Sequence, residues 1–197
     1  MKIYDISQEL LTSVVYPGDP SPKREALLSI EAGDICNLSA LSCCLHNGTH
    51  IDAPSHFIDG GKTVDEIDLE KCVGYCYLAA FNGTLSANDA RSLLRCARVR
   101  FPEAAKRILL KGDAVVSLEA AEVFAEAGVL LVGNESQTVG PPDAPMAVHK
   151  ALLEREVALL EGIRLDGIEN GVYFLSAQPI SVKGADGSLC RAILVEM

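Results

Sequence analysis

Hydrophobic and polar residues along this chain fall into short runs that alternate with a period of two or are apolar throughout. Runs of this kind, bounded by Gly, Pro, Asn, Asp or Ser, are typical of β-strands. They predict strands at residues 3–6, 25–31, 38–45, 71–81, 107–111, 129–132, 157–160, 171–176 and 192–196. Because these runs occur from one end of the chain to the other, a β-sheet is predicted at the centre of the fold.

Three other segments follow the helical period and carry residues that begin or end helices. Ser86, Ser117 and Asp143 are predicted N-caps, because their side-chain oxygens can accept hydrogen bonds from the first free backbone N–H groups. The helices are predicted to end near residues 98, 127 and 154. Gly128 is the expected stop of the second helix, and Pro145 is tolerated in the first turn of the third.

The second of these helices joins two strands, 107–111 and 129–132, into a β-α-β unit. A crossover helix covers the sheet, so this unit predicts a parallel pair of strands that is buried on both faces. The predicted fold class is α/β, with a mixed β-sheet core flanked by helices. A length of 197 residues with 49% hydrophobic content supports a sizeable core, and one domain over residues 1–197 is predicted.

The charge of the chain limits its possible partners. A formal net charge of -10 at pH 7 has no compensating block of Lys or Arg. Nucleic acid and anionic membrane surfaces are therefore poor partners, since phosphate groups bind to clustered cations. No apolar run reaches the roughly 18 residues that span a bilayer, and the first residues lack the apolar stretch of a signal peptide. The expected location is the cytoplasm.

The seven cysteines are an odd number and include no C-x-x-C pair. This pattern predicts reduced and mostly buried thiols. Cys72 and Cys76 lie in the predicted strand 71–81, where their even spacing points both side chains to one face without joining them. We expect both to act as small hydrophobic residues rather than as metal ligands or redox centres.

One segment, residues 45–56, holds three of the four histidines of the chain, His46, His50 and His56, together with Asp52. Imidazole and carboxylate groups are the ligands that suit zinc, manganese or iron. The alternative interpretation, three ordinary loop histidines that neighbouring hydrogen bonds satisfy, does not explain why they cluster around a Gly, an Asp and a Pro. The segment therefore predicts a metal site, and the absence of thiol ligands favours an open catalytic site over a closed structural one.

The backbone of this segment must bend for the site to form. In a straight strand His46 and His50 would lie ~13 Å apart, too far to share an ion. A helix is disfavoured by Gly48 and by Pro54, which also biases Ala53 to an extended conformation. A bent loop remains, in which Gly48 supplies unusual dihedral angles and Pro54 directs His56 back toward the ion.

Three further residues are candidates for the site, and for two of them, His149 and Glu161, the pattern alone leaves two interpretations open. His149 lies on the third predicted helix at an inward-facing position, as either a core residue or a ligand. Glu161 ends an apolar run just before Gly162, where its carboxylate is either solvated or delivered into a site. Tyr16 opens the turn-rich run 16–22, which predicts a rigid loop of the kind that borders a pocket.

The run His46-Asn-Gly-Thr-His-Ile-Asp-Ala-Pro-Ser-His56 resembles the H-x-G-T-H-x-D-x-P-x-H motif of the cyclase-like metal hydrolases, a family that includes bacterial kynurenine formamidase. The resemblance extends over nearly the whole chain, through residues 5–7, 16–19, 118–133, 160–162 and 183–188. It implies an α/β fold of the swivelling β/β/α type and a homo-oligomer, either a dimer or a tetramer.

The resemblance also implies a role for each site residue. The first metal ion would be bound by His46, His50 and Asp52. Asp52 and Glu161 would bridge to a second ion that His149 also holds, and His56 would be the general acid/base. Zinc, two ions per subunit, is the expected metal, with manganese as the alternative. Such ions polarise a carbonyl and activate a bound water as the attacking hydroxide.

The chain departs from the family pattern in ways that concern the substrate. Tyr16 stands where the formamidases carry a Trp, and the chain has no Trp at all. Tyr16 is still expected to form an aromatic wall of the substrate pocket. Residues 133–140 replace several positions of the family's G-x-D-x-x-S-x-D pattern, with Glu135 and Thr138 as partial substitutes. The identity of the substrate is therefore the least determined feature.

The predicted function is a divalent-metal-dependent hydrolase of a small amide, an N-formyl aryl amine such as N-formylkynurenine. One alternative keeps the site but opens the ring of a cyclic amide or lactone, as isatin hydrolases do. A second alternative is a non-catalytic protein in which the ion only holds loops together. A third is a cysteine hydrolase using Cys44 and His46, which are close in sequence but lack an evident orienting group.

Overall fold

A nine-stranded mixed sheet forms the centre of the structure, a computed structural model that describes residues 1–196. Its strand order is β1-β13-β11-β5-β7-β9-β10-β4-β12. In that order the strands are Lys2–Asp5, Ile193–Glu196, Gly171–Ser176, Val73–Ala80, Arg107–Lys111, Leu131–Asn134, Ala158–Glu161, His50–Asp52 and Gly187–Leu189. The four strands from β5 to β10 are parallel to one another, and the strands on either side pair antiparallel.

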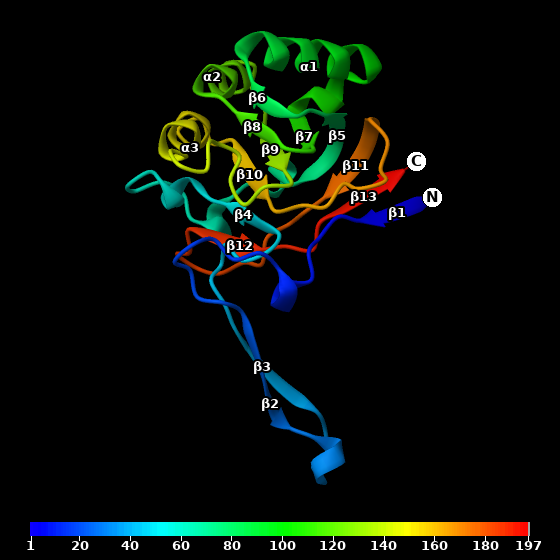
Figure 1. Ribbon diagram of the computed structural model, residues 1–197, viewed down its shortest axis with the longest axis vertical. Helices are drawn as coiled ribbons and strands as arrows, with labels where there is room; N and C mark the ends of the chain where they lie inside the picture. The colour runs from blue at the N-terminus through cyan, green and yellow to red at the C-terminus, as the bar shows by residue number, and fades with distance from the viewer. Residues whose placement is uncertain (197) are drawn as a thin grey trace.

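Three helices cover one face of this sheet: α1 (Ala87–Arg100), α2 (Leu118–Glu126) and α3 (Met146–Leu153) (Figure 1). Ser86 and Ser117 cap α1 and α2 as predicted, accepting hydrogen bonds from the backbone of Asp89 and Ala120. Strands β7 and β9 pair in parallel with α2 between them in the chain, which confirms the predicted β-α-β unit.

The start of α3 was predicted wrongly. The helix begins at Met146 with Pro145 in the N-cap position and no side-chain cap, so Asp143 does not start it. Pro145 explains the difference, because a proline ring disfavours the helical conformation in the residue before it, and the helix cannot extend further toward the N-terminus.

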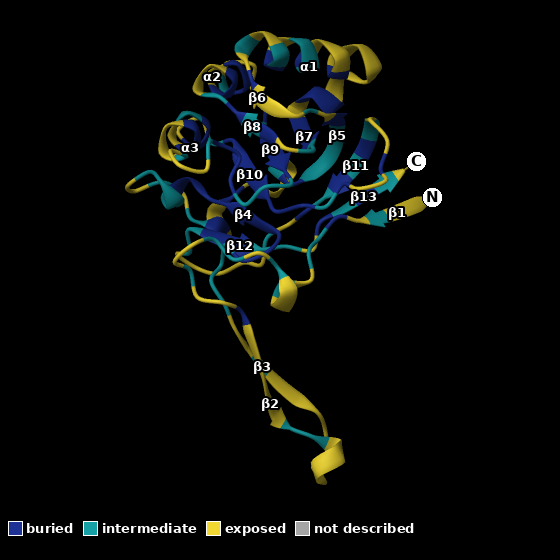
Figure 2. Ribbon diagram, in the orientation of Figure 1, coloured by how far each residue is buried: buried dark blue, intermediate teal, exposed yellow. Residues whose placement is uncertain are grey.

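Successive side chains of the central strands point alternately into two hydrophobic cores, one on each face of the sheet. Ile108 and Leu110 of β7 pack into the core beneath the helices, whereas Leu109 packs into a second core on the opposite face. All three side chains are fully buried, and Figure 2 shows the same for most of the central strands. Burial on both faces is what a parallel sheet requires, so the predicted α/β class with a mixed sheet flanked by helices is confirmed.

Two predicted strands form a hairpin that projects away from this body (Figure 1). Strand β2 (Lys23–Leu28) pairs antiparallel with β3 (Leu38–Ser42), and neither joins the main sheet. Most of the hairpin is exposed (Figure 2), including apolar side chains at Leu27, Ile30, Ile35, Leu38 and Leu41. We call residues 23–42 the arm.

Several short elements carry too few residues for the sequence pattern to predict. They are the strand pair β6 (Gly83–Leu85) and β8 (Ala114–Val116), strands β4 and β12, and the 3-10 helices Leu10–Thr12, Ile30–Ala32, Pro54–His56, Val64–Glu66, Leu69–Lys71 and Pro102–Lys106. No helix within residues 1–196 is long and apolar enough to cross a membrane.

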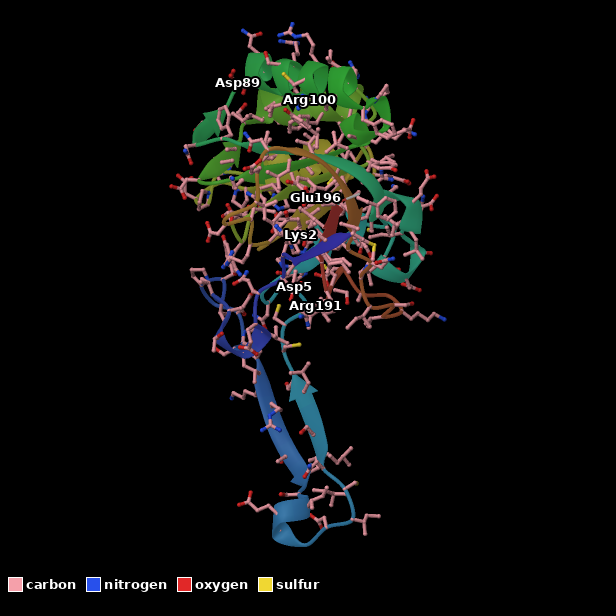
Figure 3. All side chains as sticks on the ribbon, turned by 90° about the vertical axis from the view of Figure 1, so that its right-hand side faces the viewer. Lys2, Asp5, Asp89, Arg100, Arg191 and Glu196 are labelled. Atoms are coloured by element: carbon pink, nitrogen blue, oxygen red, sulfur yellow. The ribbon has the colours of Figure 1, made fainter. Side chains whose placement is uncertain are left out.

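The two ends of the chain meet at one edge of the sheet. Strand β1 pairs with β13, which sets Lys2 opposite Glu196. Nearby, Nε of Arg191 donates to Oδ1 of Asp5 at 3.0 Å (Figure 3). These contacts tie the first strand to the last and so complete the sheet.

All seven cysteines are free thiols, as expected for reduced residues, but the prediction that most of them are buried is wrong, because only Cys72 and Cys76 are buried. Cys72 and Cys76 are fully buried in the second core, and burial raises the pKa of each thiol to about 12. Thiols in this state are neutral at physiological pH, which suits the predicted role as small hydrophobic residues.

Candidate metal centre

One pocket of about 390 Å³ collects all four histidines of the chain. It lies where β4, β10 and α3 meet the loops that precede β4 and β12. Its lining residues are Tyr16, Asp19, Cys44, His46, His50, His56, Phe57, Gln137, Thr138, Pro145, His149, Glu161 and Asp186. Asp52 lies beneath this surface, with only 1% of its side chain exposed. The structure therefore brings together the five predicted metal ligands, His56 and Tyr16. Glu135 lies outside this pocket, and its carboxylate accepts hydrogen bonds from the backbone of Gly112 and Leu165.

The bend that the sequence predicted occurs at Gly48, where φ is 60° and lies in the left-handed region that favours glycine. The chain then enters β4 rather than staying a loop, and this short strand places His50 and Asp52 on one side and Ile51 in the second core. Thr49 fastens the bend to the rest of the fold, because its hydroxyl donates to the carbonyl oxygen of Gly162 at 2.8 Å.

Strand pairing then places the second carboxylate, that of Glu161, in the site. β4 runs antiparallel to β10, and the register sets Glu161 directly opposite His50. On the other side β4 pairs with β12, which sets Gly187 opposite Asp52. Pairing on both sides of β4 explains why its polar side chains can be held rigidly although it is only three residues long.

The candidate ligands form two groups that share Asp52. In the first, Oδ1 of Asp52 lies 2.8 Å from Nδ1 of His46 and 3.4 Å from Nε2 of His50. In the second, Nε2 of His149 lies 3.1 Å from Oε1 of Glu161 and 3.6 Å from Oδ2 of Asp52. Each oxygen of one carboxylate thus faces a different group, which is the arrangement that a bridging ligand requires.

This donor set fits divalent metal ions. Within each group the ligand atoms all lie within 4.8 Å of one another. Oδ2 of Asp52 is buried and has no hydrogen-bond partner among the described residues. A buried charged oxygen without a partner is costly, and a cation between Asp52, His149 and Glu161 would satisfy it. Three imidazoles and two carboxylates are also the ligand types that zinc and manganese accept.

Close contacts within this centre shift the pKa values of its histidines and of Asp52. Burial alone would lower the pKa of His50, but hydrogen bonds to Asp52 and Glu161 outweigh it and raise that pKa to about 10. The same competition raises the pKa of His46 and of His149. Burial likewise acts to raise the pKa of Asp52, yet the hydrogen bonds from His46 and His50 hold it well below its usual range. The carboxylates thus favour positive charge on the surrounding imidazoles, as they would favour a bound cation.

His56 stands apart from the two ligand groups. It ends the 3-10 helix Pro54–His56, and its ring stacks on that of His46 with centroids 4.1 Å apart. About a quarter of its side chain is exposed, 27%, compared with 1% for His50. Phe57 packs edge-on against it at 4.5 Å. His56 is thus held at the pocket wall, beside the candidate ligands and accessible to a bound molecule.

Comparison with known proteins identifies the family. Residues 4–141 match the family described as putative cyclase. The chain belongs to this family. The kynurenine formamidase of Erythrobacter litoralis (strain HTCC2594) is 30% identical to this cyclase-family chain, over 100% of the chain and 94% of the relative. The kynurenine formamidase of Bacillus anthracis is 32% identical, over 98% and 97%.

Solved structures support the same conclusion. A potential metal-dependent hydrolase with cyclase activity is 27% identical, with a TM-score of 0.80 over 98% of this chain and 96% of the other. Isatin hydrolase A from Labrenzia aggregata has a TM-score of 0.81 over 100% and 94%, but its identity of 19% shows a shared fold alone. Together with the formamidases, these relatives confirm the predicted enzyme class, a metal-dependent hydrolase of the amide type.

The structure also adds Asp186 and Gln137, which the sequence reasoning gave no role, and places Thr138, expected as a partial substitute for a family position, in the same pocket. Asp186, just before β12, reaches both His46 and His56. Gln137 and Thr138 line the pocket with buried polar atoms that have no partner among residues 1–196. Asp186 lies in the segment 183–188 that resembles the family, but a position 140 residues from His46 in sequence gives no local signal.

Cys44 does not have the properties of a nucleophile. Burial raises the pKa of its thiol, and the thiol faces Oδ2 of Asp19 at 3.6 Å. Both ring nitrogens of the neighbouring His46 face carboxylates, Asp52 and Asp186. A cysteine hydrolase needs an activated thiolate and a free imidazole base, so this rival is disfavoured.

Proposed function

We propose that this cyclase-family protein uses divalent metal to hydrolyse a small amide, with an N-formyl aryl amine such as N-formylkynurenine as the favoured substrate. The observation that carries the proposal is the pair of ligand groups sharing the buried carboxylate of Asp52 at the base of the pocket. The substrate assignment is supported by the two relatives named kynurenine formamidase, which match this chain over nearly their full length.

In this proposal His46, His50 and Asp52 hold one ion, and Asp52, Glu161 and His149 hold a second. Zinc is the expected metal and manganese the alternative, because both accept nitrogen and carboxylate donors. When bound, such ions polarise a carbonyl group and lower the pKa of a coordinated water.

His56 would act as the general acid/base. Its Nδ1 faces the carboxylate of Asp186 at 3.1 Å, and no residue among 1–196 forms a hydrogen bond with its Nε2. That nitrogen is therefore available to move a proton to the leaving amine nitrogen of a bound amide. The exposure of His56 at the pocket wall supports this role over a purely structural one.

Tyr16 is proposed to contact the substrate. It lines the pocket, and its hydroxyl lies 3.4 Å from the carbonyl oxygen of Pro142. That contact holds the loop of Tyr16 next to the turn that precedes α3. Tyr16 and Phe57 supply the aromatic walls of a pocket whose volume, about 390 Å³, suits a small molecule.

A second candidate substrate is a cyclic amide. Both polar atoms of the Gln137 side chain are buried without a hydrogen-bond partner in the described chain, and Gln137 lines the pocket. A primary amide presents one acceptor and one donor side by side. The edge of a lactam or cyclic imide presents the complementary pair, so ring opening at the same metal centre is the alternative function.

We also propose that the protein works as a homo-oligomer in the cytoplasm. Leu27, Ile35 and Leu41 of the arm are 50%, 98% and 55% exposed, and an isolated two-stranded hairpin is marginally stable in water. Contact with another copy, a dimer or a tetramer, would cover this surface. The cytoplasmic location is supported by the seven free cysteines, which suit a reducing compartment.

A substrate panel tests the proposed function. Purified protein loaded with Zn²⁺, or with Mn²⁺, is assayed against N-formylkynurenine, formanilide, a lactam, a cyclic imide and a lactone. We expect N-formylkynurenine to give the highest kcat/KM. Turnover of cyclic substrates alone would replace the formamidase assignment with ring opening and keep the metal-dependent chemistry.

Chelation separates an enzyme from a protein in which metal is only structural. We expect EDTA to abolish hydrolysis while the far-UV circular dichroism remains, and added metal to restore the activity. Unfolding on chelation, with no hydrolysis of any amide or ester before it, would contradict the enzyme proposal.

A further inference from the structure

One carboxylate oxygen contacts two histidines of the pocket. Oδ2 of Asp186 lies 3.0 Å from Nε2 of His46 and 3.1 Å from Nδ1 of His56. The two rings are stacked with an angle of 28° between their planes, so both can present a ring nitrogen to the same oxygen. Asp186 therefore lies beneath the edges of a candidate metal ligand and of the candidate general acid/base.

The backbone around Asp186 is fixed to the strand that carries the ligands. The carbonyl oxygen of Asp186 accepts a hydrogen bond from the backbone N–H of Ala53 at 2.9 Å. The next residue, Gly187, pairs with Asp52 in the register of β12 and β4. A Cβ atom at Gly187 would lie 2.6 Å from Cε1 of His46, so glycine is needed there for the ring to lie beside the strand. The carboxylate thus has a defined position relative to both histidines, although 48% of its side chain is exposed.

We propose that Asp186 is a positioning residue that fixes opposite tautomers of His46 and His56, an inference that rests on the proposed function. A carboxylate only accepts hydrogen bonds, and a neutral imidazole has one N–H and one lone pair. With a metal ion between Nδ1 of His46 and Asp52, His46 must therefore carry its proton on Nε2, and its Nδ1 lone pair is directed to the ion. His56 must carry its proton on Nδ1, which leaves Nε2 to exchange protons with a substrate.

The physical advantage is that one carboxylate, Asp186, sets both the metal-binding nitrogen of His46 and the proton-transferring nitrogen of His56. A ligating histidine whose other nitrogen donates to a carboxylate is held in one tautomer and orientation and is a more basic ligand. The same bond to His56 prevents its ring from rotating and presenting Nδ1 to the pocket. Without Asp186 each imidazole would populate both tautomers, and only a fraction of molecules would have both nitrogens correctly set.

The test compares Asp186→Ala and Asp186→Asn with the wild type. A matched control is Asp65→Asn, because Oδ1 of Asp65 accepts a hydrogen bond from the backbone of Gly184 at 3.0 Å and so supports the same loop. It removes the same charge, and none of its hydrogen bonds goes to a histidine. The first readout is the long-range ¹H–¹⁵N spectrum of ¹⁵N-labelled protein loaded with Zn²⁺. Only four histidines contribute, and all of them line the pocket.

We expect the wild type and Asp65→Asn to show the Nε2–H form of His46 and the Nδ1–H form of His56. In Asp186→Ala both signals should shift toward mixed tautomers, and competition with a chelator should show Zn²⁺ affinity about 10- to 100-fold weaker. Its kcat should fall by a similar factor while KM changes less than about threefold. Asp186→Asn, which keeps one acceptor oxygen, should recover part of each loss.

Unchanged tautomers and Zn²⁺ affinity within twofold of the wild type in Asp186→Ala would overturn the proposal. These two readouts need no substrate. If the tautomers shift as expected but no amide or lactone is hydrolysed even by the wild type, Asp186 still positions the histidines and only the proposed function fails.

Discussion

His56 has one ring nitrogen bonded to Asp186 and the other free to meet a bound molecule. This asymmetry at the scale of a single residue distinguishes it from His46, whose two ring nitrogens both face carboxylates. A histidine with one held and one free nitrogen can orient itself and still transfer a proton.

We expect His56→Ala to lose hydrolysis by about 10²- to 10⁴-fold, the usual contribution of a general acid/base. Metal content should stay at the wild-type level, because the two ligand groups around Asp52 do not include His56. Steady-state kinetics and elemental analysis of the same preparation measure both quantities. Full activity in this variant would remove His56 from the mechanism.

The pKa values of the ligands predict how metal binding depends on pH. The pKa of His50 is raised to about 10, so this imidazole holds a proton at neutral pH without metal, and the pKa values of His46 and His149 are raised in the same direction. An ion must displace protons bound to these imidazoles, and its apparent affinity should therefore increase as the pH rises from 6 toward 8.

The carboxylate of Asp52 does not change the expected increase of metal affinity with pH. Its pKa is lowered, so it remains ionised throughout that range and contributes no pH dependence there. Chelator competition at several pH values, or calorimetry in buffers of different ionisation enthalpy, measures the protons released. Affinity that stays constant between pH 6 and 8 would show that the histidines are already neutral in the metal-free protein.

At the scale of elements, the site depends on the contact between the end of β10 and the bend before β4. Gly162 follows Glu161 directly, with φ of 69°. A Cβ atom at this position would overlap the carbonyl oxygen of Gly48 and lie 2.6 Å from Nε2 of Gln8. The two segments that carry the ligands therefore approach each other more closely than any other residue type permits.

We expect Gly162→Ala to lower the free energy of unfolding by more than about 2 kcal/mol and to weaken metal binding. Gly128→Ala is the matched control, because Gly128 has a similar φ of 73° but no atom within 4 Å of the added Cβ. The control should lose only about 1–2 kcal/mol of backbone strain, with metal affinity unchanged. Urea unfolding and chelator competition measure the two effects, and equal losses in both variants would contradict the close-contact argument.

At the scale of the whole molecule, the arm is the feature that the rest of the chain does not explain. Its two strands pair only with each other, and its apolar side chains meet no core. The main sheet, by contrast, lies between two hydrophobic cores. Exposed apolar patches of this kind mark sites of contact with other proteins, and this is the basis of the proposed assembly.

We expect light scattering to show a dimer or a tetramer for the wild type. The double variant Leu27→Glu and Leu41→Glu should shift this assembly toward the monomer, because charges would enter the interface. Val99→Glu is the control, since Val99 is an apolar residue of α1 that is 81% exposed on the body. An unchanged mass in the arm variant, or a monomeric wild type, would contradict the proposed assembly.

The local pattern of the sequence was sufficient for most strands and for two helix starts. Alternation, capping residues and Gly or Pro act over a few neighbouring positions, and Ser86 and Ser117 cap their helices where that chemistry predicts. The ligand segment was predicted in the same way, since Gly48 could supply the bend and the donors were close in sequence. The resemblance to the cyclase-like hydrolases then gave His149 and Glu161 a role that their own neighbourhoods left open.

Tertiary structure alone decided which distant groups meet. The register of β4 with β10 sets Glu161 opposite His50, and the register of β12 with β4 brings Asp186 to the histidines. Local alternation likewise could not show that the predicted strands at 25–31 and 38–45 leave the sheet to form the arm. A residue pattern shows which face of a strand is apolar. Which strand pairs with it, and what covers that face, depends on contacts between residues far apart in the sequence, and the local pattern carries no information on them.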